Sequence, residues 1–166
     1  MSEADAGLKR VRYFPGQLLS ADDFTAEQEY LREKRKLSNR LLLGYGVVSG
    51  LGVSVGPSTV KVSPGLAVDR HGNEVIVGCP VEVALPTGGK AVLLSLEYRE
   101  TETDPVPAGS GMEASRIEEG CQLIFVAAPS AAGIPIAKLV RRARRWSIEK
   151  RFRVRLAKPE ARRRDS

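Results

Sequence analysis

The stretch YFPGQLLSADDFTAEQEYLREKRKLSNRLLLGYGVVSGLGV, residues 13–53, decides how this chain is organised. A Pro-Gly turn comes first, and Ser20 is then followed by Asp23 at the spacing of a helix capping box. Basic residues crowd the second half of the segment, where the helix dipole favours positive charge. Closely spaced glycines end the pattern. The sequence therefore predicts one helix over Ala21–Leu43, about 35 Å long.

Two interpretations of this helix remain open. Its apolar stripe consists of Phe24, Leu31, Leu41 and Leu42, widened by Tyr30 and Leu37. In the first interpretation the stripe packs on the protein's own sheet and the charged face is solvated. In the second, one end of the helix packs on the sheet and the rest meets other subunits, because such a helix is longer than a small β domain is wide.

From Val47 onward, strand-like alternation replaces helical spacing. Apolar segments recur at intervals near ten residues between Gly- and Pro-rich turns, from residues 47–55 to residues 152–156. Such spacing predicts about eight short strands in an antiparallel β-sandwich or barrel. The expected fold class is therefore mainly β with one long N-terminal α-helix.

We expect four regions along the chain. They are a flexible N-terminus (1–12), the turn with the long helix (13–46), a β-sandwich domain (47–157) and a basic disordered tail (158–166). Inside the β domain, the Pro- and Gly-rich stretch Arg99–Arg116 is predicted to be an exposed loop. A loop of that length suggests a role in contact.

The composition argues against several kinds of site. Cys79 and Cys121 lie far apart and His71 is the only histidine, so the chain cannot supply the roughly four Cys or His ligands of a zinc centre. Both thiols are expected to be buried and reduced, with a disulfide as the alternative. No apolar run approaches the roughly 18 residues of a membrane span. No catalytic, metal or cofactor site is expected.

Positive charge is concentrated at the C-terminal end. From Lys138 onward the chain has 13 Lys and Arg residues against three acidic ones. The predicted basic patch consists of Arg141, Arg142, Arg144 and Arg145. It suits an acidic protein partner better than the phosphate backbone of nucleic acid. A small enzyme or sugar-binding domain using the Arg99–Ala114 loop is a third alternative, weakened by the absence of a catalytic base and by the single Trp.

Several segments carry a resemblance to a known family. They are Tyr13–Leu19 (YFPGQLL), Asp22–Phe24 (DDF), Glu27–Tyr30, Asn39–Leu41, Gly44–Leu51 (GYGVVSGL), Val62–Ile76, Glu97–Glu100, Asp104–Pro107 and Ser115–Ile117. Together they resemble small baseplate or tail-associated proteins of phage-tail-like contractile injection systems. The opening segment is also distantly similar to the amino-terminal shoulder region of the type VI secretion baseplate adaptor. The resemblance implies a non-enzymatic structural or adaptor subunit that assembles with other baseplate or tail proteins in the bacterial cytoplasm, with a homotrimer favoured.

The helix combines the most specific resemblance with a length greater than its own domain needs. We therefore place the assembly interface on the turn and helix, at Tyr13, Phe14, Phe24, Gln28, Tyr30, Leu31, Arg35, Asn39 and Arg40. Nucleic-acid binding through the basic C-terminal segment is the alternative function.

Overall fold

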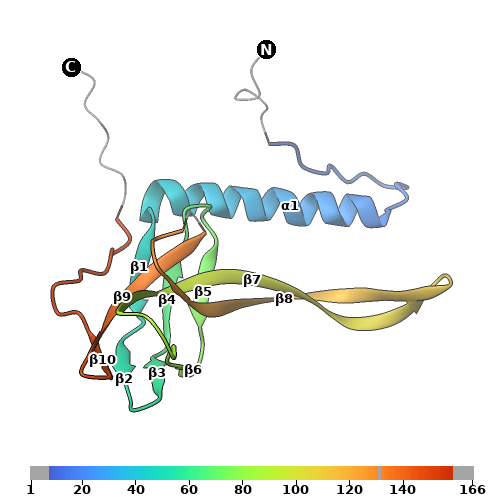
Figure 1. Cartoon of the computed structure of the whole chain (residues 1–166). Helices are drawn as coiled ribbons and strands as arrows, with labels where there is room; N and C mark the ends of the chain where they lie inside the picture. The colour runs from blue at the N-terminus through green and yellow to red at the C-terminus, as the bar shows by residue number, and fades with distance from the viewer. Residues whose placement is uncertain (1–7, 131, 159–166) are drawn as a thin grey trace, which may run out of the picture.

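The computed structural model describes residues 8–130 and 132–158. Most of the expected flexible N-terminus (1–7) and of the expected basic tail (159–166) lies outside the described residues. A long helix lies across one end of a β body, and a two-stranded ribbon projects from that body in the direction of the helix's N-terminal end (Figure 1).

The helix is confirmed over its expected length. Helix α1 spans Ala21–Ser38, and a π-helical turn, η2 (Asn39–Leu43), continues it. The capping box is also confirmed, because Ser20 Oγ accepts a hydrogen bond from the Asp23 amide at 3.3 Å and the Asp23 carboxylate accepts one from the Ser20 amide at 3.0 Å. These bonds satisfy amides that a helix N-terminus leaves unpaired.

Within the described residues, ten strands form three antiparallel sheets. The first sheet has the strand order β1 (Gly46–Gly50), β4 (Gly65–Val68), β5 (Glu74–Val77). The second sheet has the order β2 (Val53–Val55), β3 (Thr59–Val62), β6 (Val81–Ala84). The third sheet has the order β10 (Arg145–Ile148), β9 (Gly133–Arg142), β7 (Ala91–Ala108), β8 (Gly111–Val126). The mainly β fold with one N-terminal helix is therefore confirmed. The three sheets do not close into a barrel.

The core is aliphatic and lies between these sheets. Its largest fully buried side chains are Leu94, Leu96, Ile134, Leu139, Val60, Val62, Val68 and Val75. The central strand β7 supplies two of the leucines and pairs with both β8 and β9. The β body therefore has a complete hydrophobic core of its own, to which α1 contributes no buried residue.

The stretch Arg99–Arg116, including the expected Arg99–Ala114 loop, is not a loop. Strands β7 and β8 pair in one unbroken register out to Ala108 and Gly111, whereas the pairing of β7 with β9 ends at Glu97. Pro105 and Pro107 make this stretch of sequence resemble an irregular loop. Their spacing puts both on the same edge of β7, and beyond Glu97 no other strand of the described residues pairs with that edge, so their missing amide hydrogens break no second ladder.

The last expected strand, Phe152–Leu156, is reduced to a single bridge. Leu156 pairs in parallel with Val47, and the rest of the segment runs without a ladder. The Val47 amide donates to Arg155 O and the Val47 carbonyl accepts from Ala157 N, both at 2.8 Å. The segment thus ties the C-terminal end of the chain to the start of β1, beside the end of the helix.

The two thiols are free, as expected, but their burial differs from the prediction. Cys121 on β8 is half-buried and Cys79, in the connection after β5, is exposed. The expectation that both are buried is therefore wrong for Cys79. It lies outside the alternating part of β5, whose inward-facing positions are taken by Val75 and Val77.

Candidate assembly surface

The C-terminal half of the helix is attached to the β body by polar contacts. Asn39 is the one buried residue of α1 and η2, and its Nδ2 donates to Gly72 O at 2.9 Å and to Glu74 Oε1 at 3.1 Å. Arg35 Nε donates to the same Glu74 Oε1 at 2.8 Å, and Arg35 also forms an ion pair with the second carboxylate oxygen. The hydrogen bond from Arg35, helped by that from Asn39, lowers the pKa of Glu74 below its ordinary value.

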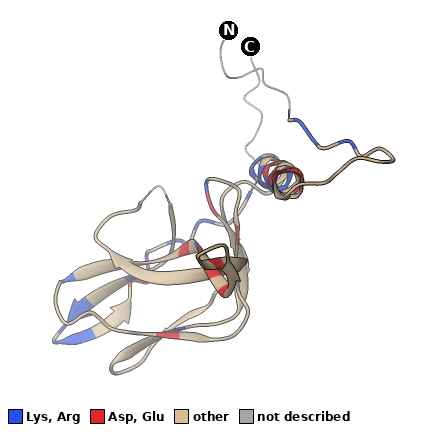
Figure 2. Cartoon of the chain, turned by 90° about the vertical axis from the view of Figure 1, so that its right-hand side faces the viewer, with Lys and Arg blue, Asp and Glu red and all other residues tan. Residues whose placement is uncertain are grey.

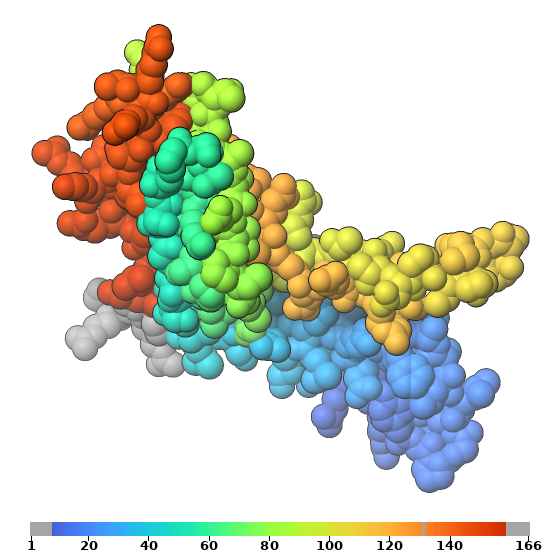
Figure 3. All heavy atoms as spheres, turned by 90° about the horizontal axis from the view of Figure 1, so that it is seen from below, coloured from blue at the N-terminus to red at the C-terminus, as the bar shows by residue number. Residues whose placement is uncertain are grey.

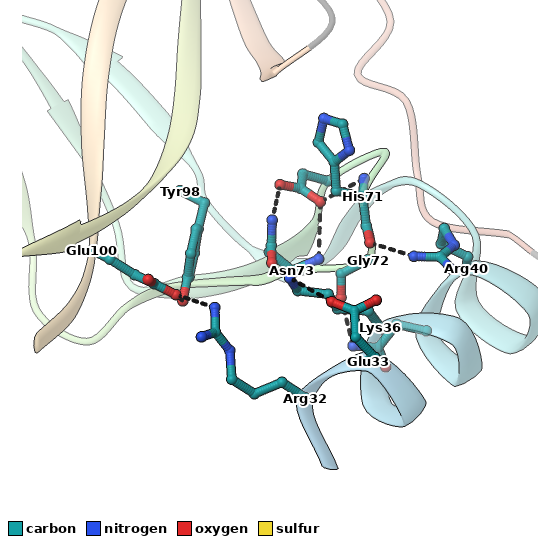
Figure 4. A network of polar contacts seen from close by, with 11 residues as sticks. Arg32, Glu33, Lys36, Arg40, His71, Gly72, Asn73, Tyr98 and Glu100 are labelled. Atoms are coloured by element: carbon teal, nitrogen blue, oxygen red, sulfur yellow. Dashed lines mark hydrogen bonds and ion pairs between the residues drawn. The ribbon is translucent and has the colours of Figure 1, made fainter. Parts of the chain in front are cut away.

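Two more contacts extend this attachment to the ribbon and to the β4–β5 loop (Figure 4). Arg32 Nη2 donates to Glu100 Oε1 at 2.5 Å, and the Tyr98 hydroxyl donates to the same oxygen at 2.8 Å. Arg40 Nη1 donates to His71 O at 2.7 Å. The helix is therefore fixed to three separate parts of the β body by side chains on one of its faces.

Gly72 allows the helix to approach the β4–β5 loop very closely. Its φ is +88°, and a Cβ built there would lie 2.3 Å from the carbonyl oxygen of Lys36. A side chain at this position would push the loop and the helix apart. The same loop holds His71, whose amide donates to Asp69 Oδ1 at 2.8 Å. The only histidine is thus part of a structural loop.

The apolar stripe does not pack on the protein's own sheet. Its members are exposed at Phe24, Leu31, Leu37, Leu41 and Leu42. Phe24 and Leu31, seven residues apart, share one side of the helix, and Arg32 and Asn39 share the adjacent side that meets the β body. The interpretation in which the stripe packs on the sheet is therefore wrong, because polar residues occupy the contact. Packing against other subunits stays a prediction.

The arm before the helix continues this apolar surface. The Gln17 amide donates to Phe14 O at 3.1 Å and closes the expected turn. The Tyr13 hydroxyl donates to Glu27 Oε2 at 2.6 Å, which holds the arm against α1. Leu18 is 93% exposed. Sequence reasoning did not single out Leu18, although its place between the turn and the N-cap shows that it belongs to neither core nor helix.

The nine predicted interface residues divide into two groups. Tyr13, Phe14, Phe24 and Leu31 lie on the exposed arm and stripe with Gln28, and Tyr30 is half-buried under the Lys34 ammonium. The other three, Arg35, Asn39 and Arg40, make their contacts within the chain. The first group is available to a partner, and its role in assembly stays a prediction.

The ribbon adds a second projecting surface. Val106, Met112 and Ile117 are exposed on it, and the space-filling view shows helix and ribbon extending past the β body on the same side (Figure 3). A hollow of about 180 Å³ lies where they meet, lined mainly by Arg32, Arg35, Lys36, Asn39, Glu74, Tyr98 and Glu119. Ribbon residues were missed from sequence because the ribbon itself was not expected.

The predicted basic patch lies at the other end of the molecule. The view along the helix shows Lys and Arg gathered at the end of the β body remote from α1 (Figure 2). Arg142, Arg144 and Arg145 are exposed at the β9–β10 turn. Arg141 is held back, because its Nη1 donates to Thr87 O at 2.8 Å and its guanidinium lies 5.9 Å from the centre of the Trp146 ring. Binding by this patch stays a prediction.

Two classes of site find no support in the described part of the chain. Between residues 8 and 158, residue 131 aside, no three His, Cys, Asp or Glu side chains are grouped to hold a metal ion. Over the same residues, the structure has no helix that is both long and apolar enough to pass through a bilayer.

Comparison with known proteins shows a fold shared with baseplate components. No protein-family model matches the chain, and no curated protein matches its sequence. A chain in the baseplate complex from the type VI secretion system matches with a TM-score of 0.61 at 16% identity, over 90% of this chain and 60% of that one. A chain of the TssK-TssF-TssG baseplate subcomplex matches with 0.62 at 17% identity, over 90% and 62%.

TssK itself gives a similar result. TssK of the EAEC type VI secretion system, solved with a nanobody, matches with a TM-score of 0.55 at 18% identity, over 79% of this chain and 54% of TssK. This chain thus spans about three-fifths of the length of the first two similar structures. At these identities the likeness shows the fold, and the resemblance to baseplate proteins expected from the sequence holds at that level.

Proposed function

We propose that this protein is a structural subunit of a contractile, phage-tail-like particle, where it acts as an adaptor in or near the baseplate. It carries out no chemistry, and it works by joining other baseplate or tail proteins through its N-terminal arm and helix. It assembles in the bacterial cytoplasm, with three copies as the favoured state. The fold shared with type VI baseplate structures supports this proposal.

One observation carries the proposal: an 18-residue helix without a buried residue displays an apolar stripe to solvent. Exposed apolar side chains scattered singly need no explanation, whereas a continuous patch on one element marks an interaction surface. Here the exposed apolar residues are Phe14 and Leu18 on the arm and Phe24 and Leu31 on the helix, and the hydrogen bond from Tyr13 to Glu27 holds the arm against the helix. The β body has its own core, so no part of the described chain covers this patch.

A matched pair of variants tests the proposal. Leu31→Glu places a charge between the exposed apolar residues of the stripe, and Ala26→Glu places the same charge at an exposed position on the side of α1 away from Phe24 and Leu31. Tail-like particles would be sedimented from cells producing each variant, and the protein would be detected in the particle fraction by immunoblotting. We expect wild type and Ala26→Glu in the particles and Leu31→Glu in the supernatant.

The same pair addresses self-association. Light scattering on the purified wild type is expected to give a mass near three times the monomer's 18.0 kDa, and Leu31→Glu is expected to lower it. Wild-type protein that never enters particles would overturn the proposed role. If Leu31→Glu enters particles to the same extent as Ala26→Glu, the helix stripe is not part of the assembly interface.

A further inference from the structure

An arginine-lined pocket lies beside the C-terminal end of the helix, and no sequence motif points to it. The pocket has a volume of about 220 Å³, and its polar lining includes Arg40 from η2, Arg70 from the β4–β5 loop and Arg155 from the C-terminal segment. Tyr45 lies between two of them, with the guanidinium carbons of Arg70 and Arg155 at 4.3 and 4.6 Å from its ring centre. Stacking on an aromatic face fixes a guanidinium while its edge stays free for hydrogen bonds.

Most of the hydrogen-bond donors in this pocket have no partner among residues 8–130 and 132–158. A guanidinium has five N–H donors; Arg40 uses one on His71 O and Arg155 uses one on Tyr45 O. Among the described residues, none of the pocket's arginines takes part in an ion pair. Converging, prearranged guanidinium groups favour a carboxylate or phosphate.

Asp69, the acidic residue that lines the pocket, does not satisfy these arginines. It is 3% exposed, and its Oδ1 accepts hydrogen bonds from the His71 and Asn73 amides at 2.8 and 2.9 Å. Its Oδ2 accepts one from Asn73 Nδ2 at 2.7 Å. The carboxylate therefore stabilises the β4–β5 loop, and the described residues that line the pocket carry an excess of positive charge.

The ribbon carries the complementary charge. Over residues 98–119 its exposed acidic residues are Glu100, Glu102, Asp104, Glu113, Glu118 and Glu119, against Arg99 and Arg116. Within the described residues, Glu100 is the one member of this set in an ion pair, with Arg32. The outer part of the ribbon thus presents carboxylates that have no ion-pair partner among the described residues, on a projecting two-stranded support.

These two surfaces cannot meet within one copy of the chain. The pocket lies at the C-terminal end of the helix, whereas the ribbon projects toward the helix's N-terminal end (Figure 1). The ribbon's free part, Arg99–Ala108 of β7 with its partner strand, is roughly 33 Å long. Opposite charges at opposite ends of a molecule are brought together by head-to-tail association, which closes into a ring when the rotation between copies allows it.

We infer that the acidic ribbon of one copy docks its carboxylates in the Arg40–Arg70–Arg155 pocket of the next copy. This inference rests on the proposed structural role and adds to it a contact separate from the helix stripe. The ribbon and pocket then link neighbouring copies in addition to any contact that the stripe makes. The contact is charge-assisted, so it weakens as salt screens the charges.

Charge reversal tests this contact from both sides. Arg70→Glu/Arg155→Glu reverses the charge of the pocket, and Glu102→Arg/Glu113→Arg reverses that of the ribbon at exposed positions. The combined four-residue variant has opposite charges again. The matched control is Arg142→Glu/Arg144→Glu at the β9–β10 turn, which makes the same charge change far from the pocket. Self-association of each full-length protein would be measured by sedimentation velocity at low and high salt.

We expect each two-residue reversal to weaken wild-type self-association by at least about tenfold, the effect of losing close charge pairs at an interface. The combined variant is expected to recover it, and the control is expected to match wild type. If the pocket variant does not fold, the ribbon variant alone decides, because its positions are exposed. Four outcomes would each overturn the inference. The wild type could be monomeric, or the ribbon variant could self-associate like wild type. The combined variant could fail to recover self-association, or the control could lose as much self-association as the pocket variant.

These results are separable from those that test the proposed function. If Leu31→Glu loses self-association and neither charge reversal has an effect, the ribbon–pocket contact is refuted and the structural role stands. If the protein self-associates through ribbon and pocket but never enters tail-like particles, the contact stands and the structural role is refuted.

Discussion

Gly72→Ala is expected to loosen the helix from the β body. The substitution places a methyl group 2.3 Å from the carbonyl oxygen of Lys36, about 1 Å inside ordinary contact distance. The obstacle on both sides is backbone, so it cannot be avoided by a change of rotamer. The loop and the helix must move apart, and two hydrogen bonds to this loop, from Asn39 to Gly72 O and from Arg40 to His71 O, are lost or lengthened.

The magnitude has two parts. An alanine held at positive φ costs about 1 to 2 kcal/mol by itself. Two hydrogen bonds at about 1 kcal/mol each add a further cost of about 2 kcal/mol. Gly89→Ala isolates the first part, because Gly89 has nearly the same φ of +89° and its added Cβ would meet nothing closer than Val92 Cγ1 at 3.9 Å. We expect Gly72→Ala to lower the free energy of unfolding by about 3 kcal/mol and Gly89→Ala by about 1 kcal/mol.

Urea unfolding followed by circular dichroism measures both values, and hydrogen exchange locates the loss. In Gly72→Ala, the amides of α1 are expected to exchange faster while those of β7 stay protected, because the core lies in the sheets. Equal destabilisation by the two variants, within about 0.5 kcal/mol, would refute the claim that the helix rests on this glycine.

Two further predictions concern single side chains. Arg35 and Asn39 lower the pKa of Glu74, so the contribution of this carboxylate to stability is fully present above its ordinary pKa of 4.5 and is lost as pH falls through the lower folded-state value. The difference in unfolding free energy between wild type and Glu74→Gln should therefore shrink below about pH 4.5. A difference that stays constant with pH would contradict this prediction. Ser95 Oγ is fully buried and has no hydrogen-bond partner within residues 8–130 and 132–158, so Ser95→Ala should leave the melting temperature unchanged or raise it. A clear loss of stability would contradict this prediction.

The helix and most of the short strands could be predicted because their signals are local. The Ser20–Asp23 pair, the basic last turns and the glycine at residue 44 define the helix without reference to the rest of the chain. The strands of the first two sheets likewise alternate between inward and outward residues and end at turns. In both cases neighbours in sequence decide the structure.

The ribbon could not be predicted in this way because its stability comes from the opposite strand. Pro105 and Pro107 disfavour a strand when considered alone. They are tolerated because the pairing of β7 with β8 continues from the core in an unbroken register and one edge of β7 is open there. The position of the last β9 pair, at Glu97, therefore decides which residues may be proline, and a single sequence does not give that position.

The arginine pocket was missed for a related reason. Arg40, Arg70 and Arg155 belong to segments separated by 30 and 85 residues, and the bridge of Leu156 to Val47 brings the last of them to Tyr45. In sequence, Arg155 reads as one of several alternating arginines in a solvated strand. The absence of that strand leaves it free to stack on Tyr45.

The distribution of polar and apolar contacts along α1 bears on how the isolated chain behaves. An amphipathic helix on a globular protein normally turns its apolar face to the core; here the polar face meets the β body and the apolar face meets solvent. An isolated helix of this length is marginal in water, and the first three turns, before Arg32, have no ion pair or hydrogen bond to the β body among the described residues. The N-terminal half of α1 is therefore the part of the helix that gains most when another protein covers Phe24 and Leu31, so protection of its amides should rise on assembly while that of η2 stays the same.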